Sequence, residues 1–192
     1  MPITLVKGEN VSLTREDPGL THLLLGLGWE VGDTQGEPFD LDTSIFMLDA
    51  DGRVTAAEDF IFYNNLVSAC GSVVHSGDNQ SGEDNGDAEN ISIDLTTISP
   101  VIERLAICVS IHLAEQRLQN FGMVKNAYVR VLNKKTAEEL VRFSLSDNAS
   151  IESAVLFGEL YRFGSEWKFR ASAEGHGGGL ADIARSYGVD VA

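Results

Sequence analysis

The sequence predicts an all-β protein, folded as a two-sheet β-sandwich with short peripheral helices and a C-terminal helix. Short runs rich in Val, Ile, Leu, Phe and Tyr recur along the 192 residues, and clusters of Gly, Asn, Asp and Ser separate them. Periodicity typical of helices is scarce. Ten such runs suffice for two packed sheets, and the predicted strands are residues 22–29, 43–48, 59–64, 72–75, 90–95, 105–113, 126–132, 138–145, 152–163 and 166–173.

Two short connections are predicted to be tight hairpin turns, one at "DADG" (49–52) and one around Gly164. The segment 99–104 is predicted to form a short helix, because Ser99 suits the N-cap and Pro100 suits the first helical position. Helix is therefore expected only at the joints between strands.

Two further helices are predicted. Residues 114–122, "AEQRLQNFG", are expected to make one or two helical turns that end at Gly122. After the three glycines at 177–179, the segment 180–188 carries four apolar side chains on one helical face, namely Leu180, Ile183, Ala184 and Tyr187. This pattern predicts a C-terminal helix docked on the sandwich.

Length and charge limit the class of protein. A chain of 192 residues suits one domain, predicted over residues 1–192. No run of eighteen apolar residues occurs, and the start "MPITLVKGEN" lacks the features of a signal peptide, so we expect a cytoplasmic protein that does not insert into a membrane. The formal net charge of −15 disfavours nucleic acid as a partner, because phosphate backbones require Lys and Arg.

Cysteine usage gives a further expectation. Cys70 and Cys108 both lie in apolar, strand-like runs, and neither has a CxxC partner. We therefore predict two free thiols in the core rather than a disulfide or a reactive site.

Acidic residues are concentrated in one third of the chain. Residues 30–94 carry fifteen Asp and Glu against one cation, Arg53, whereas the rest of the chain carries fourteen acids and thirteen bases. Within this third, the stretch "HSGDNQSGEDNGDAENISIDL" (75–95) interleaves acids with glycines and contains no Lys or Arg. Either this segment is a solvated loop, or it binds a cation.

Oxygen-bearing side chains recur at ligand-like spacing in this region. Asp40 and Asp42 in "FDLD" are two residues apart, so an extended chain would point both to one side. Asp87 and Glu89 repeat this spacing just before a predicted strand, and the neighbouring loop adds Asp78 and Asn79. The candidate metal ligands are therefore all hard oxygens.

Calcium is the cation that suits these ligands best. Two carboxylates about 4 Å apart repel by roughly 4 kcal/mol at an effective dielectric constant near 20, so their convergence requires a counter-charge. Ca2+ accepts about 6 to 8 oxygens in flexible geometry, whereas Mg2+ retains more water and Zn2+ prefers His or Cys. Composition alone leaves the solvated loop open as the alternative, and a metal-dependent hydrolase that uses the same carboxylates is the alternative from the enzyme class.

Several motifs together resemble the TerD family of tellurite-resistance and stress proteins. They run in the same order from about Val6 to Val189, and they are "LxKGxNVSL", "GLGWE", "FDLDTSIFML", "DFIFYNN", "HSGDNQSGEDNGDAE", "IHLAEQRLQNFGMV", "AYVRV", "GELYRFGSEWKFRA" and "GGLADIARSYGV". The resemblance implies a β-sandwich that binds calcium through acidic loops and acts in resistance to tellurite and other stresses.

The resemblance also implies which residues bind the metal. The family's "FDLD" falls on Asp40 and Asp42, its "GDN" on residues 77–79, and the outer positions of its "GDDE" on Asp87 and Glu89. The second Asp of "GDDE" is Ala88 here, which removes one ligand. The Asp of the family's "GWD" is Glu30, which we treat as a reserve ligand.

These observations together predict a calcium-binding module without catalytic activity. We expect it to act in tellurite resistance and the general stress response, with acidic loops that order on binding Ca2+. The ordered loops would present a surface to other stress-resistance proteins, in the cytoplasm or at the inner face of the membrane.

Overall fold

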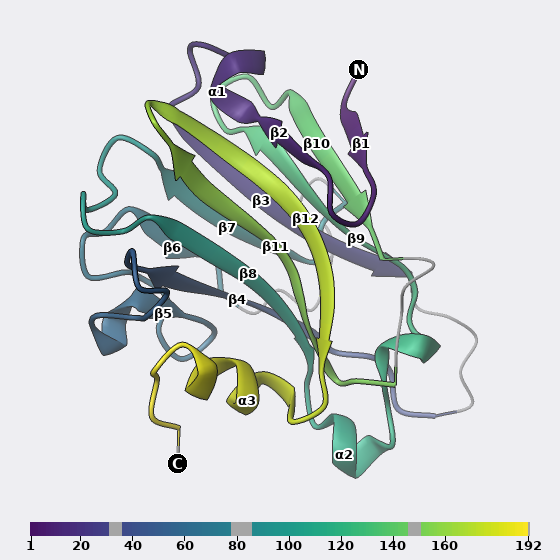
Figure 1. The fold of residues 1–192 in the computed structure, drawn as a ribbon. Coiled ribbons are helices and arrows are strands. Elements are labelled where there is room, and N and C mark those ends of the chain that lie inside the picture. The colour runs from purple at the N-terminus through teal and green to yellow at the C-terminus, as the bar shows by residue number, and fades with distance from the viewer. Residues whose placement is uncertain (31–35, 78–85, 146–150, 192) are drawn as a thin grey trace.

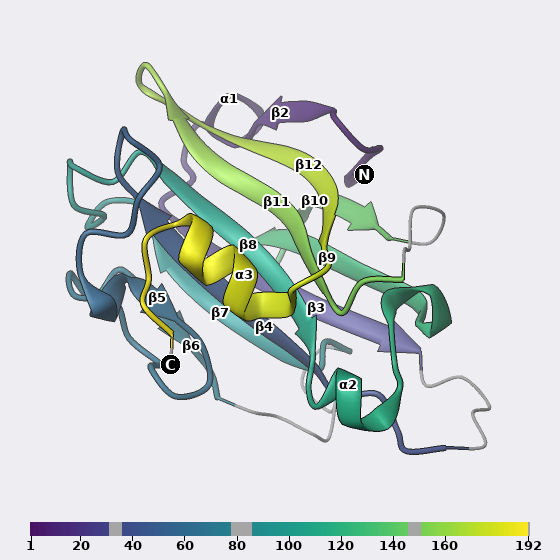
Figure 2. The same cartoon turned by 60° about the horizontal axis from the view of Figure 1, so that its bottom comes forward.

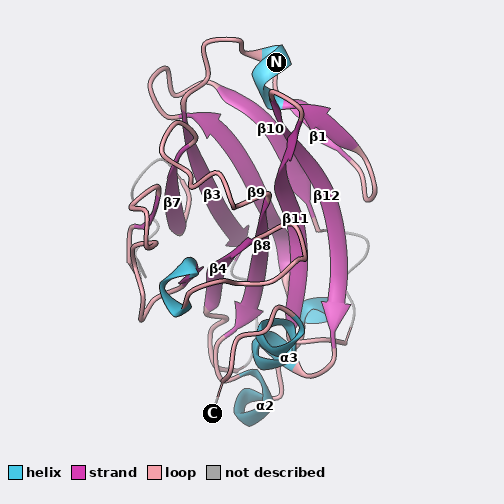
Figure 3. Ribbon diagram, turned by 60° about the vertical axis from the view of Figure 1, so that its left-hand side comes forward, coloured by secondary structure: helices cyan, strands magenta, loops and turns pink. Residues whose placement is uncertain are grey.

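The computed structural model of the protein describes residues 1–30, 36–77, 86–145 and 151–191. Its described strands form two six-stranded sheets that face each other across a shared apolar core (Figure 1). Little of the described chain is helical (Figure 3). The predicted all-β sandwich with short helices and a C-terminal helix is confirmed.

The strands of each sheet are named here in spatial order. Sheet A contains β1 (Ile3–Leu5), β10 (Glu139–Ser144), β9 (Lys125–Asn133), β3 (His22–Glu30), β7 (Glu89–Asp94) and β6 (Val73–His75). Sheet B contains β2 (Asn10–Ser12), β12 (Glu166–His176), β11 (Ala154–Phe163), β8 (Arg104–Ile111), β4 (Leu41–Leu48) and β5 (Phe60–Ile61). The helices are α1 (Leu13–Glu16), α2 (Ala114–Arg117) and α3 (Gly179–Ser186), with 3-10 turns η1 (Ala57–Asp59) and η2 (Phe121–Met123).

Alternate residues of the strands fill the space between the sheets. Leu25 and Leu27 of β3 enter this core from sheet A, and Ile107 and Val109 of β8 enter it from sheet B. Each is 2 % exposed or less, so each burial contributes about 1.5–3 kcal/mol to folding. The residues between them point outward, and this alternation decides which side chains reach each outer face.

A second apolar cluster lies outside sheet B, under α3. Ile183 and Ala184 of the helix are buried there together with Phe46, Cys108 and Leu156 of the sheet. Figure 2 shows α3 lying across the sheet, where it contacts β8, β11 and β12. The predicted docking of the C-terminal helix is confirmed.

The prediction of a helix at 99–104 is wrong. The chain makes a single turn there, in which the N–H of Ile102 donates to the carbonyl of Ser99 at 3.0 Å. The N–H of Glu103 then donates to the carbonyl of Leu48 at 2.8 Å, and β8 begins at Arg104. Pairing with β4 and burial of Ile102 therefore outweigh the local helix signals.

Other local predictions have mixed outcomes. The turn at "DADG" is present, with the N–H of Gly52 donating to the carbonyl of Asp49, and Gly164 links β11 to β12 in a hairpin. The strand predicted at 59–64 is reduced to β5, and β1 and β2 were not predicted. These two strands contain three residues each, too few to show a periodic pattern.

The prediction for the cysteines is half correct. Cys108 is a free thiol buried in the cluster under α3, whereas Cys70 is free but exposed. The apolar run around Cys70 is interrupted by a turn, in which the N–H of Gly71 donates to the carbonyl of Ser68 at 2.9 Å. This turn carries the thiol out of the core.

Candidate functional site

Residues 76–88, called the acidic segment from here on, join two neighbouring strands of sheet A. β6 ends at His75, β7 begins at Glu89, and the two strands pair with His75 opposite Ile91. The ends of the acidic segment are therefore held close together by the sheet. The contacts of the residues at these two ends define the candidate site.

Glu89 and His75 connect sheet A to the edge of β4 in sheet B. Glu89 is 3 % exposed, and its Oε2 atom accepts the N–H of Thr43 at 2.6 Å. The Nε2 atom of His75 lies 3.2 Å from the carbonyl oxygen of Thr43, and the Nδ1 atom of His75 accepts the N–H of Gly77 at 3.0 Å. Because Nδ1 accepts, the proton of a neutral His75 is on Nε2, which donates to Thr43. His75 is therefore a structural residue that links the two sheets.

Asp42 lies on the opposite face of β4 from the core. It follows Leu41, which is buried between the sheets, and its Oδ2 atom lies 3.6 Å from Nδ1 of His112. Asp40 precedes β4, and its carbonyl oxygen accepts the N–H of His112 at 2.8 Å. The "FDLD" motif is therefore attached to the end of β8 through His112.

Asp87 lies on the outer face of sheet A. Its carboxylate is fully buried, and Nε of Arg130 donates to its two oxygens at 2.9 and 3.0 Å. The hydroxyl of Tyr128 lies 3.0 Å from Oδ1 of Asp87 and 3.1 Å from the carbonyl oxygen of Gly86, so its one proton is shared between them. Burial and the neighbouring Asp87 carboxylate raise the pKa of Tyr128.

The glycines of "GLGWE" make room for these two side chains. A Cβ atom on Gly26 would overlap the carboxylate of Asp87, and a Cβ atom on Gly28 would overlap the ring of Tyr128. Both glycines occupy outward-facing positions of β3, which alternate with the residues that face the core. Their role is therefore the close approach of side chains, and not the binding of a phosphate.

Two more charged residues extend the network on this outer face. Glu139 accepts from Nη1 of Arg130 at 3.1 Å and from Nε and Nη2 of Arg142 at 2.7 and 2.9 Å. The guanidinium of Arg142 lies 4.3 Å from the ring centre of Tyr128. Glu139 therefore ties the two arginines together, and Arg142 covers Tyr128.

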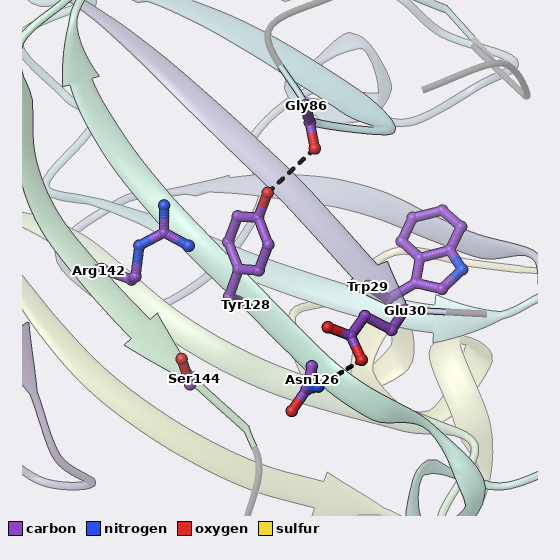
Figure 4. A pocket seen from close by; sticks show the side chains of 7 residues that line it. All are labelled: Trp29, Glu30, Gly86, Asn126, Tyr128, Arg142 and Ser144. Carbon is purple, nitrogen blue, oxygen red and sulfur yellow. Dashed lines mark hydrogen bonds between the residues drawn. The ribbon is translucent and has the colours of Figure 1, made fainter. Parts of the chain in front are cut away.

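A pocket of about 480 Å3 opens beside this network (Figure 4). Its walls include the ring of Tyr128, the guanidinium of Arg142 and the carbonyl of Gly86. Glu30 is also in the wall, where it accepts from Nδ2 of Asn126 at 2.6 Å. The reserve ligand Glu30 thus lines the outer pocket together with an amide.

The Glu139 bridge leads to a prediction about stability and pH. Burial raises the pKa of Glu139, but hydrogen bonds from Arg142 and Arg130 outweigh it and hold the pKa below its ordinary value. We expect Glu139→Gln to lower the free energy of unfolding by about 1 kcal/mol at pH 7. A lowered pKa stabilises the fold above the ordinary value of about 4.3, so the difference should vanish as the pH falls through the lowered pKa. Urea unfolding of both proteins from pH 7 to pH 3 measures it, and a constant difference would contradict the assignment.

Comparison of the sequence with known proteins identifies its family. The family model described as the TerD domain matches residues 1–187. The chain belongs to the TerD family. It is 49 % identical to general stress protein 16U of Bacillus subtilis over the full length of both chains. It is 46 % identical to the tellurium resistance protein TerD of Serratia marcescens, with 99 % of each chain covered.

Solved structures support the fold. A crystal structure of a TerD homologue from Streptomyces coelicolor A3(2) superposes with a TM-score of 0.69 at 24 % identity, covering 86 % of this chain and 96 % of that one. A second crystal structure, of a protein of unknown function, superposes with a TM-score of 0.71 at 21 % identity, covering 90 % and 99 %. At such identities the likeness establishes the TerD fold alone.

The TerD domain distributes the predicted ligands over different faces. Asp87 lies outside sheet A, Glu89 lies between the sheets, and Asp42 lies on the far face of β4. Asp78 and Asn79 lie outside the described residues. Within the described ranges, no three His, Cys, Asp or Glu side chains form a group that could hold a metal ion. The six-residue ligand set therefore stays a prediction.

The described acids fit calcium to different degrees. Glu89 and Asp42 present carboxylate oxygens near Thr43, close to where the acidic segment leaves β6, and oxygen donors suit calcium. The oxygens of Asp87 are already held by Arg130 and Tyr128. Sequence analysis missed these two partners, although an Arg that alternates with the valines of "AYVRV" is a signal for an outward-facing ion pair.

Proposed function

We propose that this TerD domain is a calcium-binding module without catalytic activity that acts in tellurium resistance and the general stress response. The relatives named for tellurium resistance and general stress support the biological role, since they match the chain over almost its whole length. The observation that carries the calcium proposal is Glu89. This buried carboxylate is fixed on Thr43, the residue after Asp42, at the base of an acidic segment.

The charge balance explains why a divalent cation belongs there. Residues 30–94 have a net charge of −14, and a carboxylate removed from water costs several kcal/mol unless charges or hydrogen bonds offset the loss of hydration. The N–H of Thr43 offsets part of this cost for Glu89. A calcium ion bound beside this end of β4 would reduce the mutual repulsion of Glu89, Asp42 and the acids of the loop.

In this proposal, calcium acts as a structural switch. Binding orders the acidic loops, and the ordered loops present a surface to other stress-resistance proteins in the cytoplasm or at the inner face of the membrane. Among the described residues, no helix has both the length and the apolar character that a membrane span requires.

Isothermal titration calorimetry tests the proposal and separates it from a metal-dependent hydrolase. We expect calcium chloride to bind tightly and magnesium chloride weakly, because Mg2+ prefers a nearly ideal octahedron with retained water. Asp42→Asn should weaken the binding of calcium. Asp51→Asn removes the same charge from an exposed turn and serves as the matched control. Tight magnesium with weak calcium would instead favour the hydrolase, and no binding of either ion would refute the proposal.

A further inference from the structure

Asp87 and Glu89 are two residues apart in the sequence but lie on opposite faces of sheet A. Glu89 faces the gap between the sheets, where it accepts the N–H of Thr43. Asp87 lies on the outer face, against Gly26 and Tyr128. The chain bends at Ala88, whose N–H donates to the carbonyl of Leu27, so the alternation expected of an extended strand does not hold here.

This separation matters for a metal site. Calcium holds its oxygen ligands at about 2.3–2.6 Å, so two ligands of one ion have oxygens within about 5 Å of each other. The paired backbones of β3 and β7, with Leu27 opposite Glu89, lie between the carboxylate of Asp87 and that of Glu89. The two side chains are therefore not placed to share one ion.

The contacts of Asp87 also argue against its binding a calcium ion. Both of its oxygens accept from Nε of Arg130, and one also faces the hydroxyl of Tyr128. The guanidinium of Arg130 places a positive charge 2.9 Å from the carboxylate of Asp87. Because Gly26 has no side chain, the carboxylate can pack directly against β3. A side chain that is 0 % exposed and matched in this way is built into the fold.

We propose that Asp87 anchors the acidic segment to the outer face of sheet A and is not a calcium ligand, with Arg130 and Tyr128 as positioning residues. The anchor fixes the point at which the acidic segment enters β7, two residues before Glu89. Glu89 therefore lies between the sheets, whereas the negative charge of Asp87 is balanced by Arg130. The calcium part of this inference rests on the proposed function, whereas the anchoring part does not.

The first test is Asp87→Asn, which keeps the shape of the side chain and removes its charge. We expect its melting temperature in excess EDTA to fall by several degrees, while calorimetry with calcium chloride finds the wild-type number of sites. Asp51→Asn, on an exposed turn, is expected to match the wild-type protein in both measurements. An unchanged melting temperature in EDTA, or the loss of a calcium site, would overturn the proposal.

The second test is Arg130→Lys, which separates anchoring from ligation by the sign of its effect. If Asp87 were a ligand, Arg130 would compete with calcium for it, and a weaker hold would tighten the binding of calcium. As a positioning residue, Arg130 supports the ligands from outside, so we expect Arg130→Lys to weaken calcium binding by about tenfold at unchanged stoichiometry. Equal or tighter binding would overturn the proposal.

The two proposals fail in different ways. A wild-type protein that does not bind calcium refutes the proposed function. The melting temperature of Asp87→Asn in EDTA then still establishes or refutes the anchor, because that measurement involves no metal.

Discussion

Arg130→Met is expected to lower the free energy of unfolding by about 3–5 kcal/mol. Methionine matches much of the arginine stem but leaves the carboxylate of Asp87 buried without its counter-charge, and Asp87 is 0 % exposed. Breaking a buried ion pair from one side costs far more than the pair contributes, because the remaining charge has lost its hydration. Urea unfolding at pH 7, extrapolated to water, measures the loss.

Two variants control for this effect. Arg142→Met makes the same substitution on the same face of sheet A, but its side chain is 33 % exposed against 14 % for Arg130, so we expect a loss of only about 1 kcal/mol. Arg130→Met combined with Asp87→Asn removes the orphaned charge and should recover part of the stability. Equal losses for Arg130→Met and Arg142→Met would contradict the account of the buried pair.

Calcium is expected to stabilise the wild-type protein by about 2.7 kcal/mol when present at one hundred times its dissociation constant. For a chain of 192 residues this free energy raises the melting temperature by about 5–10 °C relative to EDTA. The physical reason is linkage, because the proposed site would assemble its carboxylates only in the folded state, and calcium would then bind that state in preference to the unfolded chain. Differential scanning calorimetry with and without EDTA measures the shift.

The calcium shift should depend on particular acids and not on net charge. Asp42→Asn combined with Asp78→Ala is expected to remove most of the shift, whereas Asp51→Asn should retain it. Asp78 belongs to the predicted ligand set but lies outside the described residues, so its role rests on the sequence. A full shift in the Asp42→Asn, Asp78→Ala variant would exclude these residues as ligands.

Local sequence patterns predicted most of the fold. Strands such as β3, β8 and β11 contain eight or more residues of strongly apolar character, and each lies within two residues of its predicted bounds. The failures are local signals that long-range pairing outweighs, such as the helix cap at Ser99, which becomes a turn because Glu103 binds Leu48. Three-residue strands such as β1 escape prediction, since they depend on their partners.

The candidate site was less predictable than the fold. Sequence spacing suggested that Asp87 and Glu89 act together, but the bend at Ala88 places them on opposite faces of sheet A. The role of the glycines at 26 and 28 also depended on tertiary contacts, because the atoms that fill their spaces come from Asp87 and Tyr128. A short stretch of sequence does not reveal these contacts, because the residues that make them are far apart in the chain.

The sequence by itself determined the all-β class, the family and the concentration of acid in residues 30–94, because these are properties of residue types and their local order. Only the tertiary structure decided which faces Asp42, Asp87 and Glu89 take and which cation neutralises Asp87. Arg130 is 43 residues from Asp87 in the sequence, and the two meet because β3 lies between β7 and β9 in sheet A. Strand order is a property of the whole chain, so the ion pair follows from the assembled sheet.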